Sequence, residues 1–201
     1  MDFDHPPQLD DNDKTALLTL ARTTLSAFFN DDAHGPLRAF ELALSQYSPS
    51  LCDPYPCFVS LMRMEIQLRG CIGTLETENS LYNNVHENTL KAAFSDPRFS
   101  PLRKDELDQL HIEITVLGPT LPLPLLDHLE IGKHGLVIES GHHRGVLLAH
   151  VATEWGWDKK EFIDQTCQKA GLDPRGWEKY KLSYFEEIVF REWRNASSHG
   201  G

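Results

Sequence analysis

Apolar residues recur at helical spacing in three separate parts of the chain. A spacing of three and four residues places such side chains on one face of a helix, from which they can pack into a core. The proline-rich segment 31–56 breaks this pattern and leaves room for one short helix over 37–47. The pattern predicts long helices over 13–29, 81–94 and 157–170.

Shorter segments between the helices have the alternating or β-branched character of strands. Two of them, 57–62 and 68–75, are close enough in sequence to pair as a hairpin, although Met64 stands where a tight turn prefers glycine or asparagine. A second hairpin is predicted around Gly141. The pattern predicts strands over 57–62, 68–75, 111–117, 135–139, 145–149 and 181–192.

Together these elements predict one α+β domain, with a largely antiparallel sheet flanked by helices. The segment 31–56 wraps around the domain and is not a linker between two domains. We expect residues 1–12 to be flexible, residues 13–193 to form a single domain with two lobes, and residues 194–201 to be a disordered tail.

The charge balance argues against two classes of partner. The chain of 201 residues carries 30 acidic and 19 basic side chains, a formal net charge of −11. A field of this sign repels the phosphates of nucleic acids and anionic membrane surfaces. The first residues lack the basic and apolar regions of a signal peptide, and no stretch is apolar enough for a membrane helix. We therefore expect a cytoplasmic protein.

Neither a metal nor a cofactor is predicted from the sequence. The four cysteines, Cys52, Cys57, Cys71 and Cys167, show no C-x-x-C spacing, which favours reduced thiols over a zinc site. Histidines gather around 142–150, but without an H-E-x-x-H pattern, and no glycine-rich phosphate loop is present.

Three segments together carry a resemblance to a known family. Residues 68–73 read L-R-G-C-I-G, residues 96–99 read D-P-R-F, and residues 132–136 read G-K-H-G-L. In these segments the chain resembles the AMMECR-type domain family, whose bacterial branch is called AmmeMemoRadiSam system protein A and which has no established biochemical activity. The resemblance runs from about residue 13 to residue 192. It is interrupted at 149–150, where Ala-His stands in place of the family's Pro-Gln.

The resemblance implies a fold with a larger and a smaller lobe, and it places the L-R-G-C-I-G strand near the cleft between them. It also implies a modification system that includes partner proteins of the Memo type and the radical-SAM type. If the Pro-Gln pair shapes a wall of the cleft, the replacement at 149–150 changes that wall.

Cys71 is the first candidate for chemistry. It lies between Gly70 and Gly73, which leave the backbone open to close approach by a ligand. Strand alternation predicts that Arg69 shares a face with Cys71, where a guanidinium could activate the thiol or bind an anionic substrate. The structural alternative, which we favour, is a buried cysteine between glycines that let a helix pack tightly.

A cysteine nucleophile also needs a base. His134 is the first choice, because a turn could present it to a cleft, and the alternative is an exposed loop histidine. Glu113 could be a general acid or base, or a solvated residue on the outer face of a sheet. Arg98 is a candidate anion ligand with Arg69, or a local partner of Asp96 at the exit of a helix.

Two functions remain open. The chain could be an enzyme, or the enzyme-like component of a modification system, with a cleft that holds Arg69, Cys71, Arg98, Glu113 and His134. It could equally be a non-catalytic module that binds a protein or a small ligand, because no complete set of acid, base and nucleophile is recognisable.

Overall fold

The computed structural model describes residues 6–64 and 67–192, and these divide into two compact units. Unit 1 comprises residue 6 and residues 117–188, and unit 2 comprises 7–64, 67–116 and 189–192. Each unit is a small α+β structure and is described by itself. No helix among the described residues is long and apolar enough to cross a membrane.

The sequence supplies a start signal for two of the three helices of unit 2 and a stop signal for the third. α1 (Asp11–Phe28) follows a capping box, in which the carboxylates of Asp10 and Asp13 each accept a hydrogen bond from the other's backbone N–H. α2 (Gly35–Leu42) has proline in its first turn, where a missing N–H costs nothing. α3 (Leu81–Phe94) ends two residues before an Asp-Pro pair, which resists helical angles.

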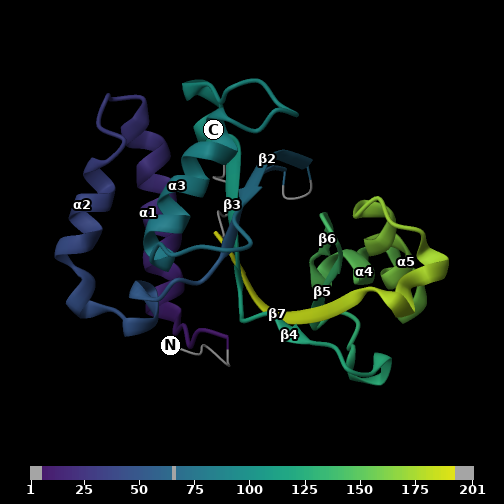
Figure 1. The fold of residues 1–201 in the computed structure, drawn as a ribbon. Helices are drawn as coiled ribbons and strands as arrows, with labels where there is room; N and C mark the ends of the chain where they lie inside the picture. Colours follow the sequence, from purple (N-terminus) through teal and green to yellow (C-terminus); the bar gives the residue numbers. More distant parts are fainter. Residues whose placement is uncertain (1–5, 65–66, 193–201) are drawn as a thin grey trace. The chain divides into compact units, whose positions relative to one another are not determined.

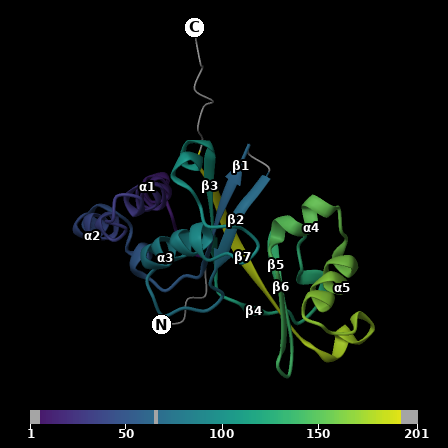
Figure 2. The same cartoon turned by 90° about the horizontal axis from the view of Figure 1, so that it is seen from above.

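The sheet of unit 2 is antiparallel. It is formed by β1 (Cys57–Arg63), β2 (Gln67–Gly73) and β3 (Leu110–Leu117), in the order β2-β1-β3, and the end of β7 (Lys181–Arg191) follows β3. Figures 1 and 2 show the three helices on one side of these strands, with α3 packed on β1 and β2.

Alternation along β1 separates a buried face from a half-buried one. Cys57, Val59 and Leu61 are fully buried, and the residues between them are partly exposed. The pairing with β2 contains a bulge: Leu61 lies opposite Gly70, while Met62 lies opposite Leu68. Arg69 is therefore the extra residue of the bulge, a position that re-aims a side chain.

The sheet of unit 1 is built around β5 (His134–Ser140), which pairs with β6 (His143–Leu147) on one side and with β7 on the other. β4 (Leu121–Pro122) pairs with β7 as well. All of these pairings are antiparallel. Two helices, α4 (Ala149–Trp155) and α5 (Lys159–Lys169), lie beside β5 and β6 (Figures 1 and 2).

Unit 1 has its own core, in which Phe162 and Ile163 of α5 pack with Leu136 and Ile138 of β5. Short 3-10 helices complete the described chain: η1 (Leu44–Gln46), η2 (Pro49–Cys52), η3 (Lys104–Gln109), η4 (Leu126–His128) and η5 (Pro174–Lys179).

The predicted fold class is confirmed, and so are the three long helices, the two hairpins and the two further strands, within a few residues at their ends. α1 begins at Asp11, inside the stretch expected to be flexible, because its capping box lies earlier than predicted. The predicted short helix is displaced to Gly35–Leu42, where Pro36 starts it. The predicted domain limits stay predictions, and the tail 194–201 lies outside the described residues.

Two local features differ from the expectation. The predicted strand 145–149 ends at Leu147, because Ala149 begins α4, which the sequence pattern missed. Only two small residues of α4, Ala149 and Ala152, are buried, so the helix has no strong apolar stripe. In the turn after β1, Met64 takes φ 47°, a left-handed conformation that is uncommon for residues other than glycine.

Candidate functional site

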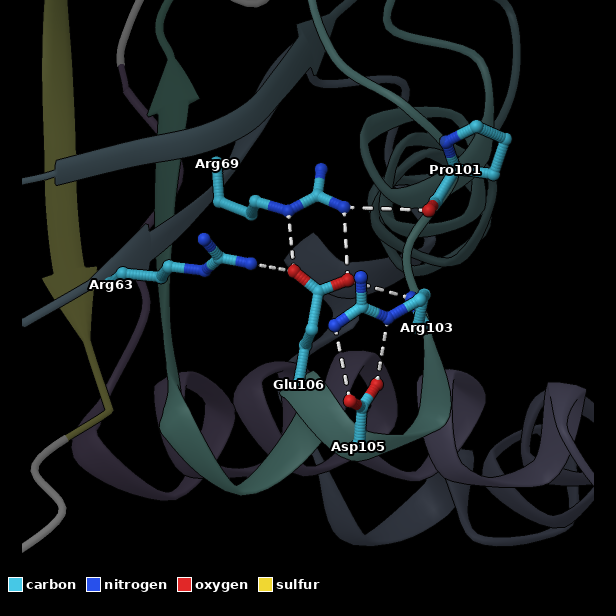
Figure 3. Close-up of polar contacts among 6 residues, drawn as sticks. All are labelled: Arg63, Arg69, Pro101, Arg103, Asp105 and Glu106. Carbon is cyan, nitrogen blue, oxygen red and sulfur yellow. Dashed lines mark hydrogen bonds and ion pairs between the residues drawn. The ribbon is translucent and has the colours of Figure 1, made fainter.

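Arg69, from the L-R-G-C-I-G strand, is buried in an ion pair with η3. Its Nε and Nη2 donate to the two carboxylate oxygens of Glu106 at 2.8 and 3.1 Å (Figure 3). The side chains of Arg69 and Glu106 are only 8% and 6% exposed. A bidentate pair of this kind fixes both side chains. The Glu106 carboxylate thus occupies the position that an anionic ligand of Arg69 would take.

Two more arginines surround the same carboxylate. Arg63 pairs with Glu106 from β1, and the backbone N–H of Arg103 donates to it at 2.8 Å, while the Arg103 side chain pairs with Asp105 (Figure 3). Burial, followed by the nearby charges of Arg63 and Arg103, lowers the pKa of Arg69. A guanidinium stays charged in spite of such a shift. The cluster joins β1, β2 and η3 within unit 2.

The backbone of Cys71 is held by two side chains from the segment after α3. Its N–H donates to Oδ2 of Asp96 at 2.9 Å, and its C=O accepts from Nη2 of Arg98 at 3.1 Å. Asp96 and Arg98 also pair with each other, with an Nη2 to Oδ2 distance of 2.7 Å. We refer to these two residues as the Asp96–Arg98 clasp. It binds one peptide group on each side of Cys71, and the Arg98 guanidinium also lies close enough to the Cys71 side chain to interact with it.

The clasp joins a buried carboxylate to an exposed guanidinium. The Asp96 side chain is 1% exposed, and that of Arg98 is 55% exposed. The hydrogen bond from Arg98 holds the pKa of Asp96 well below its usual range, against the burial that would raise it, and the backbone N–H groups of Cys71 and Arg98 add to the effect. Asp96 therefore acts as a permanent acceptor.

The Cys71 thiol belongs to a polar row that crosses the sheet of unit 2. Ser60 lies directly opposite Cys71 on β2 and directly opposite Glu113 on β3. Directly opposed residues share a face of a sheet. The Ser60 hydroxyl donates to the Cys71 sulfur at 3.2 Å, and Glu113 pairs with Arg191 at 2.6 Å. Thiol, hydroxyl, carboxylate and guanidinium thus lie side by side, and the first three are half-buried.

The two glycines that flank Cys71 are each covered by another part of unit 2. A Cβ on Gly70 would lie 2.1 Å from the backbone oxygen of Ala92 in α3, and a Cβ on Gly73 would lie 2.2 Å from the ring of Phe58. The close approach that glycine permits is therefore made by a helix and by an aromatic ring. Ligand binding by Gly70 and Gly73 stays a prediction.

His134 lies in unit 1, whereas Cys71 lies in unit 2. It is the first residue of β5 and only 4% exposed, so the interpretation as an exposed loop histidine is wrong. Its Nδ1 accepts from the backbone N–H of Glu130 at 3.1 Å, and its ring packs on Tyr184. Burial, followed by the charge of Lys133, lowers the pKa of His134, which favours a neutral ring.

No histidine among the described residues of unit 2 contacts the Cys71 thiol. His86 of α3 is 1% exposed and lies between the hydroxyl of Thr24 and the ring of His34, at 3.0 and 3.1 Å. Burial, followed by the charge of His34, lowers the pKa of His86 to about 4. The predicted pair of cysteine and histidine has no counterpart in this unit.

The structure places Cys71 and Arg98 in contact, and it adds three residues that the sequence did not place at the site. Ser60 carried one signal, since it alternates with buried residues of β1. Asp96 was considered only as a local partner of Arg98, and Glu106, the partner of Arg69, was not considered as a site residue. Across residues 6–64 and 67–192, no group of three or more His, Cys, Asp or Glu side chains is placed to hold a metal ion.

The chain is similar in sequence to a known protein family. A sequence model of the AMMECR1 family matches residues 18–190. Protein Mbar_A1807 of Methanosarcina barkeri is 35% identical over 192 residues, which cover 92% of this chain and 92% of that protein. Protein NEQ441 of Nanoarchaeum equitans is 41% identical over 143 residues, which cover 67% of this chain and 79% of that protein.

A solved structure has a similar fold. The crystal structure of uncharacterized protein PH0010 from Pyrococcus horikoshii superposes with a TM-score of 0.72 at 31% sequence identity, and the match covers 88% of this chain and 89% of that chain.

Proposed function

The chain belongs to the AMMECR1 family, and from this premise we propose that it is a non-catalytic binding module. One observation carries the proposal: the polar groups of the L-R-G-C-I-G strand are engaged inside the protein. Arg69 binds Glu106, and the peptide groups of Cys71 bind the Asp96–Arg98 clasp. The cation near the Cys71 thiol, Arg98, is itself paired with Asp96, and no histidine among the described residues of unit 2 contacts the thiol. A nucleophile without a base beside it is poorly equipped for catalysis.

The recognition surface that we propose is the face of the unit 2 sheet that carries the polar row. Ser60, Cys71 and Glu113 are half-buried there, and Arg191 is exposed. This row offers a hydroxyl, a thiol, a carboxylate and a guanidinium to a ligand, which is the mixture of polar groups that fixes the orientation of a bound partner.

The partners that we propose are proteins of the Memo and radical-SAM types, with this chain as the accessory component of their modification system. The support is the resemblance to the bacterial branch of the family. The formal net charge of −11 supports a protein partner over a nucleic acid or an anionic membrane.

The test is a binding titration of purified Memo-type and radical-SAM proteins from one organism against this protein and its variants. Glu113→Lys places a second cation beside Arg191, so we expect at least a tenfold rise in Kd. Glu139→Lys is the matched control, because Glu139 is a half-buried strand acid of unit 1 that pairs with Lys181. The proposal fails if neither partner binds, or if both variants change Kd equally.

A second candidate function, thiol chemistry at Cys71, has one observation in its favour. The Ser60 hydroxyl donates to the sulfur at 3.2 Å, so the half-buried thiol has a polar group directly beside it. Reactivity at neutral pH distinguishes the two functions, because only a thiolate reacts readily with an alkylating agent.

The chain supplies its own reference for that measurement. Cys52 is exposed, while Cys57 and Cys167 are fully buried. We would compare the labelling rate of Cys71 in Cys52→Ser with that of Cys52 in Cys71→Ser. A binding module labels at Cys71 no faster than at Cys52. Labelling of Cys71 more than tenfold faster, with loss of a turnover in Cys71→Ser, would replace the binding module with an enzyme.

A further inference from the structure

β2 is an edge strand of the unit 2 sheet. It is first in the strand order and pairs with β1 alone among the strands of the described chain. The backbone N–H of Thr74, just beyond β2, donates to the C=O of Cys57 in β1. Because backbone groups of an antiparallel strand alternate between its two sides, Cys71 and Gly73 point their N–H and C=O groups away from β1.

The N–H and C=O of Cys71 that point away from β1 are already hydrogen-bonded. Their partners take the places that a neighbouring strand would take. A strand would supply one acceptor and one donor to this residue. Asp96 supplies the acceptor at 2.9 Å, and Arg98 supplies the donor at 3.1 Å. Pro97, between them, has no N–H to offer. Residues 96–98 therefore pair the outward N–H and C=O of Cys71 without exposing unpaired backbone groups to which a further strand could add.

The other residues of this edge lack the features that usually prevent a further strand from pairing with it. The residues from Gly70 to Gly73 are uncharged, and the one charged neighbour, Arg69, is turned inward to Glu106. Edge strands are normally blunted by exposed charges, by proline or by a covering segment. Here the clasp is the only such device in contact with the outward groups of β2 among the described residues.

From these observations we infer that the Asp96–Arg98 clasp blocks strand addition at β2, and that the strand it excludes is β2 of a second copy of this chain. Two copies can pair antiparallel about a two-fold axis at Cys71, so that the N–H of each Cys71 meets the C=O of the other. The same strand is present at equal concentration on every copy, and the contact closes on itself. This inference does not depend on the proposed binding function.

The chain contains a matched control. Arg175 pairs with Asp173 through the same Asp-Pro-Arg sequence, with an Nη2 to Oδ2 distance of 2.9 Å, but this pair lies on η5 in unit 1 and not on a strand edge. The double variant Asp173→Ala/Arg175→Ala removes the same two side chains from the same local structure. It should leave self-association unchanged.

The experiment measures mass by light scattering over a range of concentrations, in a Cys52→Ser background. We expect the double variant Asp96→Ala/Arg98→Ala, which frees both outward groups of Cys71, to dimerise at least tenfold more tightly than the parent, and Asp173→Ala/Arg175→Ala to behave as the parent. A short bismaleimide should link two Cys71 residues in the dimer of the first variant, since Cys57 and Cys167 are buried. Circular dichroism checks that each variant is folded, and Asp96→Ser/Arg98→Gln replaces Asp96→Ala/Arg98→Ala if the latter is not.

The inference is overturned if the folded Asp96/Arg98 double variant keeps the parent's mass at every concentration. It is overturned as well if a dimer forms without a cross-link at Cys71, because the contact then lies elsewhere, or if Asp173→Ala/Arg175→Ala dimerises to the same extent.

Discussion

The sequence Asp-Pro-Arg occurs twice in this chain, at 96–98 in unit 2 and at 173–175 in unit 1. The local bonds are the same in both copies. In each, the backbone N–H and the Nε of the arginine donate to the aspartate two residues before it, at 3.0 to 3.1 Å, and Nη2 donates as well, at 2.7 Å in the first copy and 2.9 Å in the second.

The surroundings of the two copies differ. The Asp96 side chain is 1% exposed and accepts a further bond from the backbone of Cys71, whereas the Asp173 side chain is 52% exposed and its arginine is 90% exposed. The local sequence thus determines that the aspartate and the arginine form an ion pair. Tertiary packing determines whether that ion pair also binds another part of the chain. An exposed pair contributes little to stability, while a buried carboxylate with several donors is costly to remove.

The largest expected effect is that of Asp96→Ala. This change leaves the N–H of Cys71 and the Arg98 side chain without their acceptor, so we expect a loss of about 2–4 kcal/mol in the free energy of unfolding. Asp173→Ala should be indistinguishable from the parent protein. Urea titrations of both variants make the measurement. Equal losses would show that the local pair, and not its burial, matters.

The second largest expected effect is a difference between the two copies in how low pH changes the free energy of unfolding. The pKa of Asp96 is lowered in the folded state, so its contribution is complete above the ordinary aspartate pKa of about 4 and is lost as the pH falls below that value. Between pH 6 and pH 3 the parent should lose about 1–2 kcal/mol more stability than Asp96→Asn. Asp173→Asn should follow the parent. An unchanged acid profile in Asp96→Asn would contradict the assignment.

Arg98→Ala should have a smaller effect, because its side chain is largely solvent-exposed. We expect a loss of about 1 kcal/mol, since Asp96 keeps its bond to the backbone of Cys71. Arg175→Ala, measured in the same thermal and urea unfolding assays, should cause no loss. The comparison breaks down if Arg175→Ala is the more destabilising of the two.

The smallest expected effect is that of Cys71→Ser. The hydrogen bonds from the clasp to the N–H and C=O of residue 71 are made to its backbone, so they survive the change. We expect less than about 1 kcal/mol, measured by urea unfolding. A loss as large as that of Asp96→Ala would mean that the thiol, and not the peptide, is the important contact.

The fold was predictable from the sequence where apolar spacing is regular. The helix over 81–94 matches α3 at both ends, because its buried stripe is long and Asp96-Pro97 stops it. α4 was missed because its buried residues are two alanines. The bulge at Arg69 was not predictable either, since it depends on the register with β1.

The candidate site was predictable only in its local part. The pair of Asp96 and Arg98 follows from a spacing of two residues, and it is present in the structure. The bond from Asp96 to Cys71 joins residues 25 positions apart, and the ion pair of Arg69 and Glu106 spans 37. Such contacts are set by how α3 and η3 pack on β2, which no short motif records.

The most direct test of this account is hydrogen exchange at the amide of Cys71. Its N–H points away from β1, so the clasp alone accounts for its protection. The account predicts slow exchange in the parent and in Asp173→Ala, and exchange at least tenfold faster in Asp96→Ala, which removes the acceptor of this N–H. Exchange in the parent as fast as that of an exposed loop, or equal exchange in both aspartate variants, would contradict it.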